Sequence, residues 1–219
     1  MRILITNPTD AFTRYLLFWT NKMISEIKHN NTIYHLKNKN ANPIKFSGIL
    51  SKKDVNVVLL NGHGSDDCVM GENGIILDQQ NVSLLKGKIV HAMSCSSAKN
   101  LGDLAVKSGA RAYVGYDEPF LASRLDDKIS NPLKDKTAAL FLAPAFIAQK
   151  ALANGKTPDE AVQLARNEYN RSILKALTSP IQSDDDQFVG LLLWDRNHLV
   201  AKTKRHNFDQ QHSSKNLLQ

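Results

Sequence analysis

Short apolar runs alternate along the chain with segments whose apolar residues recur every three or four positions. The runs are bounded by polar or turn-forming residues, which predicts β-strands buried on both faces. These runs cover residues 2–6, 32–36, 55–60, 88–93 and 110–116. Near-continuous apolar strands that alternate with helices are typical of a mainly parallel sheet.

The segments with helical periodicity predict the main helices. The first helix is predicted to start after Asp10 and to include the apolar residues from Phe12 to Ile27. The others are predicted at 97–107, at 137–154 and from Thr157 to about residue 177. Asp10 is placed to cap the first helix, and Pro144 predicts a kink or break in the third. Thr157 and Glu160, separated by Pro158 and Asp159, form the sequence signature of a capping box.

Two hairpins are also predicted. Residues 69–70 and 74–77 flank the turn formed by Glu72 and Asn73. Near the C-terminus, runs 187–194 and 198–203 are separated by the turn-forming segment 195–197, which predicts a terminal hairpin.

Together these elements predict an α/β sandwich. With 219 residues, the chain is long enough for a single domain, which we place at residues 1–205. Residues 206–219 lack periodicity and are expected to form a flexible basic and polar tail. Functional groups in such sheets gather at the carboxyl ends of parallel strands. The loops after strands 55–60 and 88–93 are therefore expected to share one edge.

Composition narrows the class of protein. Lys and Arg number 28 against 21 Asp and Glu, a formal charge of +7, but no basic motif with interleaved aromatics accompanies it. Nucleic acid is therefore not an expected partner. No apolar run approaches the roughly 18 residues of a membrane span, so no membrane association is expected. Two cysteines are too few for a disulfide scaffold, which favours a cytoplasmic protein with reduced thiols.

Each of the two loops carries a reactive side chain. The first reads NGHGSDDC and contains His63 and Gly64, and the second contains Cys95 within MSCSS. A histidine within hydrogen-bond reach can convert a thiol to the nucleophilic thiolate, and the dipole of a helix starting near residue 97 would assist. The backbone N–H groups of Gly64 and Cys95 could form an oxyanion hole. This pattern predicts a Cys–His dyad.

These residues resemble the clan CD cysteine peptidases, the caspase, gingipain and clostripain families. The resemblance rests on an apolar strand ending in His-Gly-Ser, followed 32 residues later by a strand ending in a small residue and Cys. It covers about residues 55–120 and implies a caspase-like, three-layer α/β/α sandwich. It also implies peptide-bond hydrolysis, with His63 as base, Cys95 as nucleophile and Gly64 as oxyanion donor. The short spacing is closer to bacterial caspase-like and gingipain-like members than to animal caspases.

The resemblance further implies that strand 110–116, including Gly115 and Tyr116, forms part of the substrate pocket. The animal-caspase sequence Gln-Ala-Cys-Arg-Gly is absent around Cys95, so a preference for Asp at the cleavage site does not follow. One of the carboxylates at this edge, with Asp117 as the first choice before Asp66, Asp67 and Glu118, could instead bind a basic P1 side chain, the residue before the cleaved bond. Each of these carboxylates could equally be a solvated loop residue.

Other interpretations remain open at this stage. His63 could be a turn residue and Cys95 a structural thiol. His91 and Cys68 could join them in a zinc site, although their spacing matches no common zinc pattern. The fold could also serve as a catalytically silent interaction module. The dyad mechanism requires no cofactor and no metal; its partner would be a protein or peptide substrate, and the oligomeric state is left open.

Overall fold

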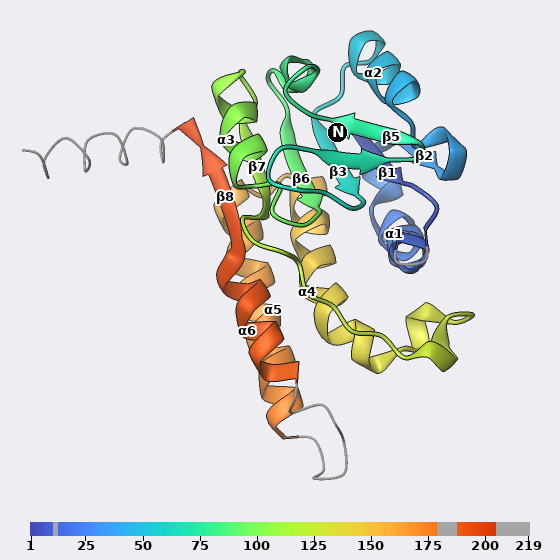
Figure 1. Cartoon of the computed structure of the whole chain (residues 1–219), viewed down its shortest axis with the longest axis vertical. Helices are drawn as coiled ribbons and strands as arrows, with labels where there is room; N and C mark the ends of the chain where they lie inside the picture. Colours follow the sequence, from blue (N-terminus) through green and yellow to red (C-terminus); the bar gives the residue numbers. More distant parts are fainter. Residues whose placement is uncertain (11–12, 179–187, 205–219) are drawn as a thin grey trace, which may run out of the picture.

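A central six-stranded sheet organises the part of the chain that this computed structural model describes, residues 1–10, 13–178 and 188–204 (Figure 1). Its spatial order is β2-β1-β3-β6-β7-β8. All neighbouring pairs are parallel except β7 and β8, which are antiparallel. The strands are β1 (Arg2–Asn7), β2 (Thr32–Lys37), β3 (Val57–Asn61), β6 (Ile89–Met93), β7 (Ala112–Tyr116) and β8 (Leu199–Thr203).

Helices cover both faces of this sheet. One layer consists of α1 (Thr13–Ile27), α4 (Lys136–Ala153), α5 (Pro158–Leu177) and α6 (Val189–His198). The other consists of α2 (Pro43–Lys52), α3 (Asn100–Lys107) and the hairpin of β4 (Val69–Gly71) and β5 (Gly74–Leu77). Single turns of 3₁₀ helix are formed by Lys28–Asn30, Asn38–Asn40, Val82–Leu85, Asp126–Lys128 and Pro132–Lys134.

The inner strands β1, β3, β6 and β7 are mainly apolar because both of their faces are buried, whereas the edge strands β2 and β8 are only partly buried and carry polar side chains. In β1, Ile3 and Ile5 pack into the core beneath α1 and α4, whereas Leu4 packs into the core beneath α2 and α3. Successive side chains of a strand point to opposite faces, so a strand between two helical layers needs apolar residues at every position. The predicted three-layer α/β/α architecture with a mainly parallel sheet is confirmed.

Several local predictions are also confirmed. Thr157 and Glu160 form the capping box of α5, in which the Thr157 side chain accepts from Glu160 N and the Glu160 side chain accepts from Thr157 N. The hairpin around Glu72 and Asn73 forms as β4 and β5. In contrast, helix α4 continues through Pro144, so of the predicted kink or break, the break is wrong.

The predicted terminal hairpin is wrong. Segment Val189–His198 is helix α6, which packs against α5, and only Leu199–Thr203 is a strand (Figure 1). A short apolar run is compatible with either a buried strand or one face of a buried helix, so its pattern does not decide between them. Residue 187, with which the hairpin was predicted to begin, and Phe12 lie outside the described residues, as does the tail 206–219.

Two further corrections concern helices. Helix α2 forms in a polar stretch that was not predicted to be helical, where Asn42 caps it by accepting from Lys45 N and Pro43 occupies its first turn. Helix α3 begins at Asn100 rather than near residue 97. Residues 94–99 form a bend and turns instead. None of the helices in the described ranges has the length and apolarity needed to cross a membrane.

Candidate active site

The sheet register places His63 and Cys95 at equivalent positions on neighbouring strands. Asn61, the last residue of β3, is paired with Met93, the last residue of β6. His63 and Cys95 each follow two residues later. Gly62 N donates to Met93 O at 3.3 Å, which continues the ladder into the loops. The two predicted loops therefore do leave the same edge of the sheet side by side.

Gly64 brings the two loops into direct contact. A Cβ atom at this position would lie 2.0 Å from Ser94 Oγ and 2.8 Å from Cys68 O, so only glycine fits. Gly64 also forms an antiparallel bridge with Val69, whose hydrogen bonds run from Met70 N to His63 O and from Ser65 N to Cys68 O. Because these bonds flank Gly64, its own N–H points away from Val69. The bridge thus leaves the Gly64 amide available for another acceptor.

His63 is paired with an acidic residue that the sequence analysis did not include in the site. Its Nε2 lies 3.3 Å from Asp10 Oδ1, and the side chains are 58% and 35% exposed. Asp10 follows β1, which neighbours β3 on the side opposite to β6. The carboxylate, the imidazole and the thiol therefore come from three consecutive strand ends.

Asp10 is itself held by the start of helix α1. Thr13 N donates to Asp10 Oδ1 at 2.9 Å, and Thr13 Oγ1 lies 2.6 Å from Asp10 Oδ2. The bond to Thr13 N is the capping interaction predicted for Asp10. The helix-start signal was correct, but it gave no indication that the same carboxylate faces His63, since that contact depends on the order of the strands.

Cys95 is half-buried against the α4 and α5 side of the core. Its Sγ lies 3.9 Å from Phe120 O. The next residue, Ser96, has a φ of 54°, which is uncommon for a residue other than glycine. Ser96 N donates to Glu118 O at 3.1 Å, so the turn is fastened to the segment that follows β7. The turn thereby holds the thiol at the edge of the core.

The predicted assistance from a helix dipole does not apply to Cys95. Helix α3 begins five residues later, at Asn100, and its N-cap is Lys99 with no capping hydrogen bond from the side chain. The influence of a helix terminus falls off within about one turn, so the dipole of α3 does not reach the thiol.

Acidic side chains and one lysine border this edge. Lys99 Nζ lies 3.4 Å from Asp66 Oδ2 and 3.8 Å from Glu118 Oε1, and all three side chains are partly exposed. Asp66, and secondly Glu118, raise the pKa of Lys99. Asp66, a predicted substrate-binding residue, thus lies on the sheet edge from which the His63 and Cys95 loops emerge, in an ion-pair cluster.

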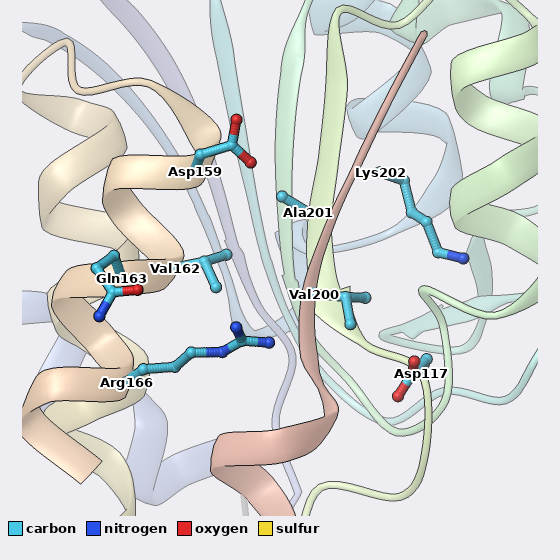
Figure 2. A pocket seen from close by; sticks show the side chains of 8 residues that line it. All are labelled: Asp117, Asp159, Val162, Gln163, Arg166, Val200, Ala201 and Lys202. Carbon is cyan, nitrogen blue, oxygen red and sulfur yellow. The ribbon is translucent and has the colours of Figure 1, made fainter. Parts of the chain in front are cut away.

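Asp117 is engaged elsewhere. Its Oδ1 lies 2.8 Å from His198 Nδ1, at the junction of α6 and β8. It also borders a cavity of about 390 Å³ whose other lining residues come from α5 and β8. In Figure 2, Arg166 extends from α5 toward β8, while Asp117 lies on the other side of that strand. Asp117 therefore already has a basic partner, and its use for a P1 side chain remains only a prediction.

Gly115 and Tyr116 do not line an open pocket. Tyr116 is fully buried, with its hydroxyl 2.8 Å from that of Tyr169 and its ring 4.7 Å from that of Phe120. Burial raises the pKa of Tyr116 well above its usual value. Gly115 is also buried, and a Cβ atom added to it would lie 3.1 Å from the backbone oxygen of Ala92. The expected pocket wall is thus part of the core.

Cys68 and His91 do not join the site. Cys68 Sγ lies 3.4 Å from Ser65 Oγ, and both Cys68 and Cys95 are free thiols. His91 is fully buried beneath α4, and burial lowers its pKa to about 3. Within residues 1–10, 13–178 and 188–204, no group of three or more His, Cys, Asp or Glu side chains is arranged to hold a metal ion.

No protein-family model matches the chain, and a search of the curated proteins found no match either.

Proposed function

We propose that the protein is a caspase-like cysteine peptidase that hydrolyses peptide bonds through Cys95 and His63. The observation that supports this most strongly is the order of the strand ends. Asp10, His63 and Cys95 follow β1, β3 and β6, which are adjacent in the sheet, and Asp10 already pairs with the imidazole. A carboxylate that orients a histidine, on a strand end adjacent to one that carries a thiol, matches the logic of a nucleophile, a base and an orienting group.

The proposed reaction begins with proton transfer from Cys95 to His63. In this scheme His63 Nε2, which lies 3.3 Å from Asp10 Oδ1, keeps its proton, and the lone pair on Nδ1 acts as the base. Nδ1 takes the proton from Cys95 Sγ. The resulting thiolate attacks the carbonyl carbon of the scissile peptide bond, and the carbonyl oxygen becomes an oxyanion.

The backbone N–H groups of Gly64 and Cys95 donate hydrogen bonds to this oxyanion. Protonated His63 then gives its proton to the leaving amine as the carbon–nitrogen bond breaks, and a thioester to Cys95 remains. His63 takes a proton from a water molecule, the resulting hydroxide attacks the thioester, and the bond to Sγ breaks. His63 returns the proton to Sγ, and the new carboxylic acid leaves and loses its proton to solvent. A thiol nucleophile must stay reduced, so the proposal places the enzyme in a reducing compartment such as the cytoplasm.

A basic P1 side chain is the preference that the charges favour. Asp66 and Glu118 both pair with Lys99, so a substrate Arg or Lys could replace that ammonium group. Asp117, our first choice from the sequence, is bound to His198. We therefore expect Asp66→Asn to weaken a preference for basic P1 residues more than Asp117→Asn does, as measured with a peptide library.

The principal test is mass-spectrometric profiling of a peptide library with the wild type and with Cys95→Ala and His63→Ala. Cleavage by the wild type that both variants lose supports the proposal. The matched control is Cys68→Ala, a variant that should cleave peptides as the wild type does. A folded wild type that cleaves no peptide would favour the interaction-module alternative.

A second prediction concerns Asp10. Asp10→Asn keeps a side-chain oxygen for Thr13 N and a good helix cap, but removes the charge beside His63. We expect kcat/KM to fall roughly 10- to 100-fold while the melting temperature changes little. Asp54→Asn, which lies before β3 at the other end of that strand and pairs with Arg2, serves as the control and should retain activity. An Asp10→Asn enzyme with wild-type kcat/KM would remove Asp10 from the mechanism.

A further inference from the structure

A chain of hydrogen-bonded polar side chains runs through the core beneath the edge that carries the site. It joins the sheet to helices α1 and α4 and is buried except at its outer end, which is half-buried. The participating residues, in order, are His35, Asn7, Thr20, Asn61, Gln149 and His91. Buried polar groups are costly unless satisfied, so a connected chain of them in an apolar core calls for an explanation.

The centre of the chain is the hydroxyl group of Thr20. Asn7 Nδ2 donates to Thr20 Oγ1 at 3.2 Å, and Asn61 Nδ2 donates to the same oxygen at 3.3 Å. Asn7 and Asn61 are the last residues of β1 and β3, and each follows directly on the paired residues Thr6 and Leu60. One hydroxyl on α1 therefore ties together the ends of two neighbouring strands.

Helix α4 supports this centre from the other side. Gln149 Nε2 donates to Asn61 Oδ1 at 2.6 Å and lies 3.4 Å from His91 Nδ1. At the outer end, His35 Nε2 lies 2.8 Å from Asn7 Oδ1. The side-chain amides of Asn7 and Asn61 are thus each hydrogen-bonded through both the nitrogen and the oxygen. These bonds restrict the rotation of the two side chains and the position of the backbone that carries them.

The strand ends that Thr20 joins are those that carry Asp10 and His63. Asp10 follows Asn7 by three residues, and His63 follows Asn61 by two. Such short connections leave little freedom between the tethered asparagines and the ion pair. A displacement of the β1 end relative to the β3 end would change the 3.3 Å contact between Asp10 and His63. Reaction rates are sensitive to misplacements of this size.

We propose that Thr20 is a positioning residue, whose hydroxyl, together with Asn7, Asn61 and Gln149, fixes the Asp10–His63 pair at the strand ends next to the one that carries Cys95. This inference rests on the proposed peptidase function for its catalytic consequence. The geometric part, which concerns how His63 is presented to the thiol, can be measured without any peptide substrate.

The experiment compares Thr20→Val with Thr20→Ser in two assays. Valine has the shape of threonine but cannot accept the two amide donors, whereas serine can. We expect Thr20→Val to lower kcat about tenfold with KM nearly unchanged, and to slow iodoacetamide labelling of Cys95 by a similar factor. Labelling of each protein unfolded in urea gives the intrinsic thiol rate. Thr20→Ser should restore both quantities to within about twofold.

Thr6→Val provides the matched control. Thr6 is equally buried and directly precedes Asn7, but it points to the opposite face of the sheet. The Thr6→Val variant should keep the wild-type kcat and the wild-type rate of Cys95 labelling. If Thr20→Val does not fold, Gln149→Met, which removes the donor to Asn61, should slow Cys95 labelling in the same way.

The outcomes separate this inference from the proposed function. Rapid Cys95 labelling that is slowed by Thr20→Val, in a protein that cleaves no peptide, would support positioning and contradict peptidase activity. A folded Thr20→Val protein, or failing that Gln149→Met, with wild-type labelling and kcat would overturn the inference, as would a loss that Thr20→Ser does not restore. Equal labelling of folded and unfolded wild type would overturn it as well.

Discussion

Gly64 is the residue on which the contact between the two loops depends. It packs against Ser94, the residue before Cys95, at a distance that leaves no room for a side chain. His63, Gly64 and Cys95 could be selected from the sequence because each follows a recognisable strand. Asp10 could not, since its sequence signal is that of a helix cap and its contact with His63 spans separate elements.

We expect Gly64→Ala to abolish most activity. Its Cβ would lie 2.0 Å from Ser94 Oγ and 2.8 Å from Cys68 O, so the loop would have to move. Overpacking of this kind costs about 1–3 kcal/mol, and kcat/KM should fall at least about 100-fold. Denaturant unfolding and peptide cleavage measure the two effects. Gly48→Ala, where no atom lies within 4 Å of the added Cβ, should keep full activity; equal behaviour of the two variants would contradict the argument.

Among the helices, α5 is one whose start a local sequence signal predicts. Its start at Thr157 was predicted from the capping box, and its C-terminus is Leu177. Helix α6 shows the opposite case, because its apolar residues were assigned to a strand. The contact of α6 with α5, with Leu192 and Asp195 buried, stabilises a helix there. No residue within the segment itself indicates that contact.

Thr157→Ala should therefore weaken α5 measurably. It removes the acceptor for Glu160 N, and the loss of such a cap costs about 1 kcal/mol. The free energy of unfolding in urea gives the effect. Thr178→Ala, at the other end of the same helix, removes only the bonds from its hydroxyl to backbone oxygens and should change stability by less than about 0.5 kcal/mol. A larger loss at Thr178 would contradict this assignment.

At the scale of the whole molecule, the two helical layers bury titratable groups that couple folding to pH. Burial lowers the pKa of His91 to about 3 and that of His35 to about 4. Burial raises the pKa of Asp195 to about 8. The unfolded chain binds more protons at the histidines below pH 6.5, whereas the folded chain binds more at Asp195 between pH 3.8 and 8.

From these groups we expect maximum stability near pH 6.5. Below it, the stability contributed by the two neutral histidines is lost as the pH falls, and this outweighs the single opposing carboxyl group. Above it, the stability of the protonated Asp195 is lost as the pH rises, by about 2 kcal/mol up to pH 8. Thermal unfolding of Asp195→Asn, which keeps an acceptor for Leu121 N, should show no such alkaline loss. A parallel decline in both proteins would contradict this account.

The sequence by itself determined the α/β class, most strands, the starts of α1, α4 and α5, and the pair of loops carrying His63 and Cys95. These features follow from periodicity, capping residues and the rule that parallel strands end at one edge, all of which are local or general. The tertiary structure decided that Asp10 faces His63, that Tyr116 belongs to the core and that Thr20 joins two strand ends. Such contacts depend on the spatial order of elements distant in the chain, which hydrophobic patterning does not encode.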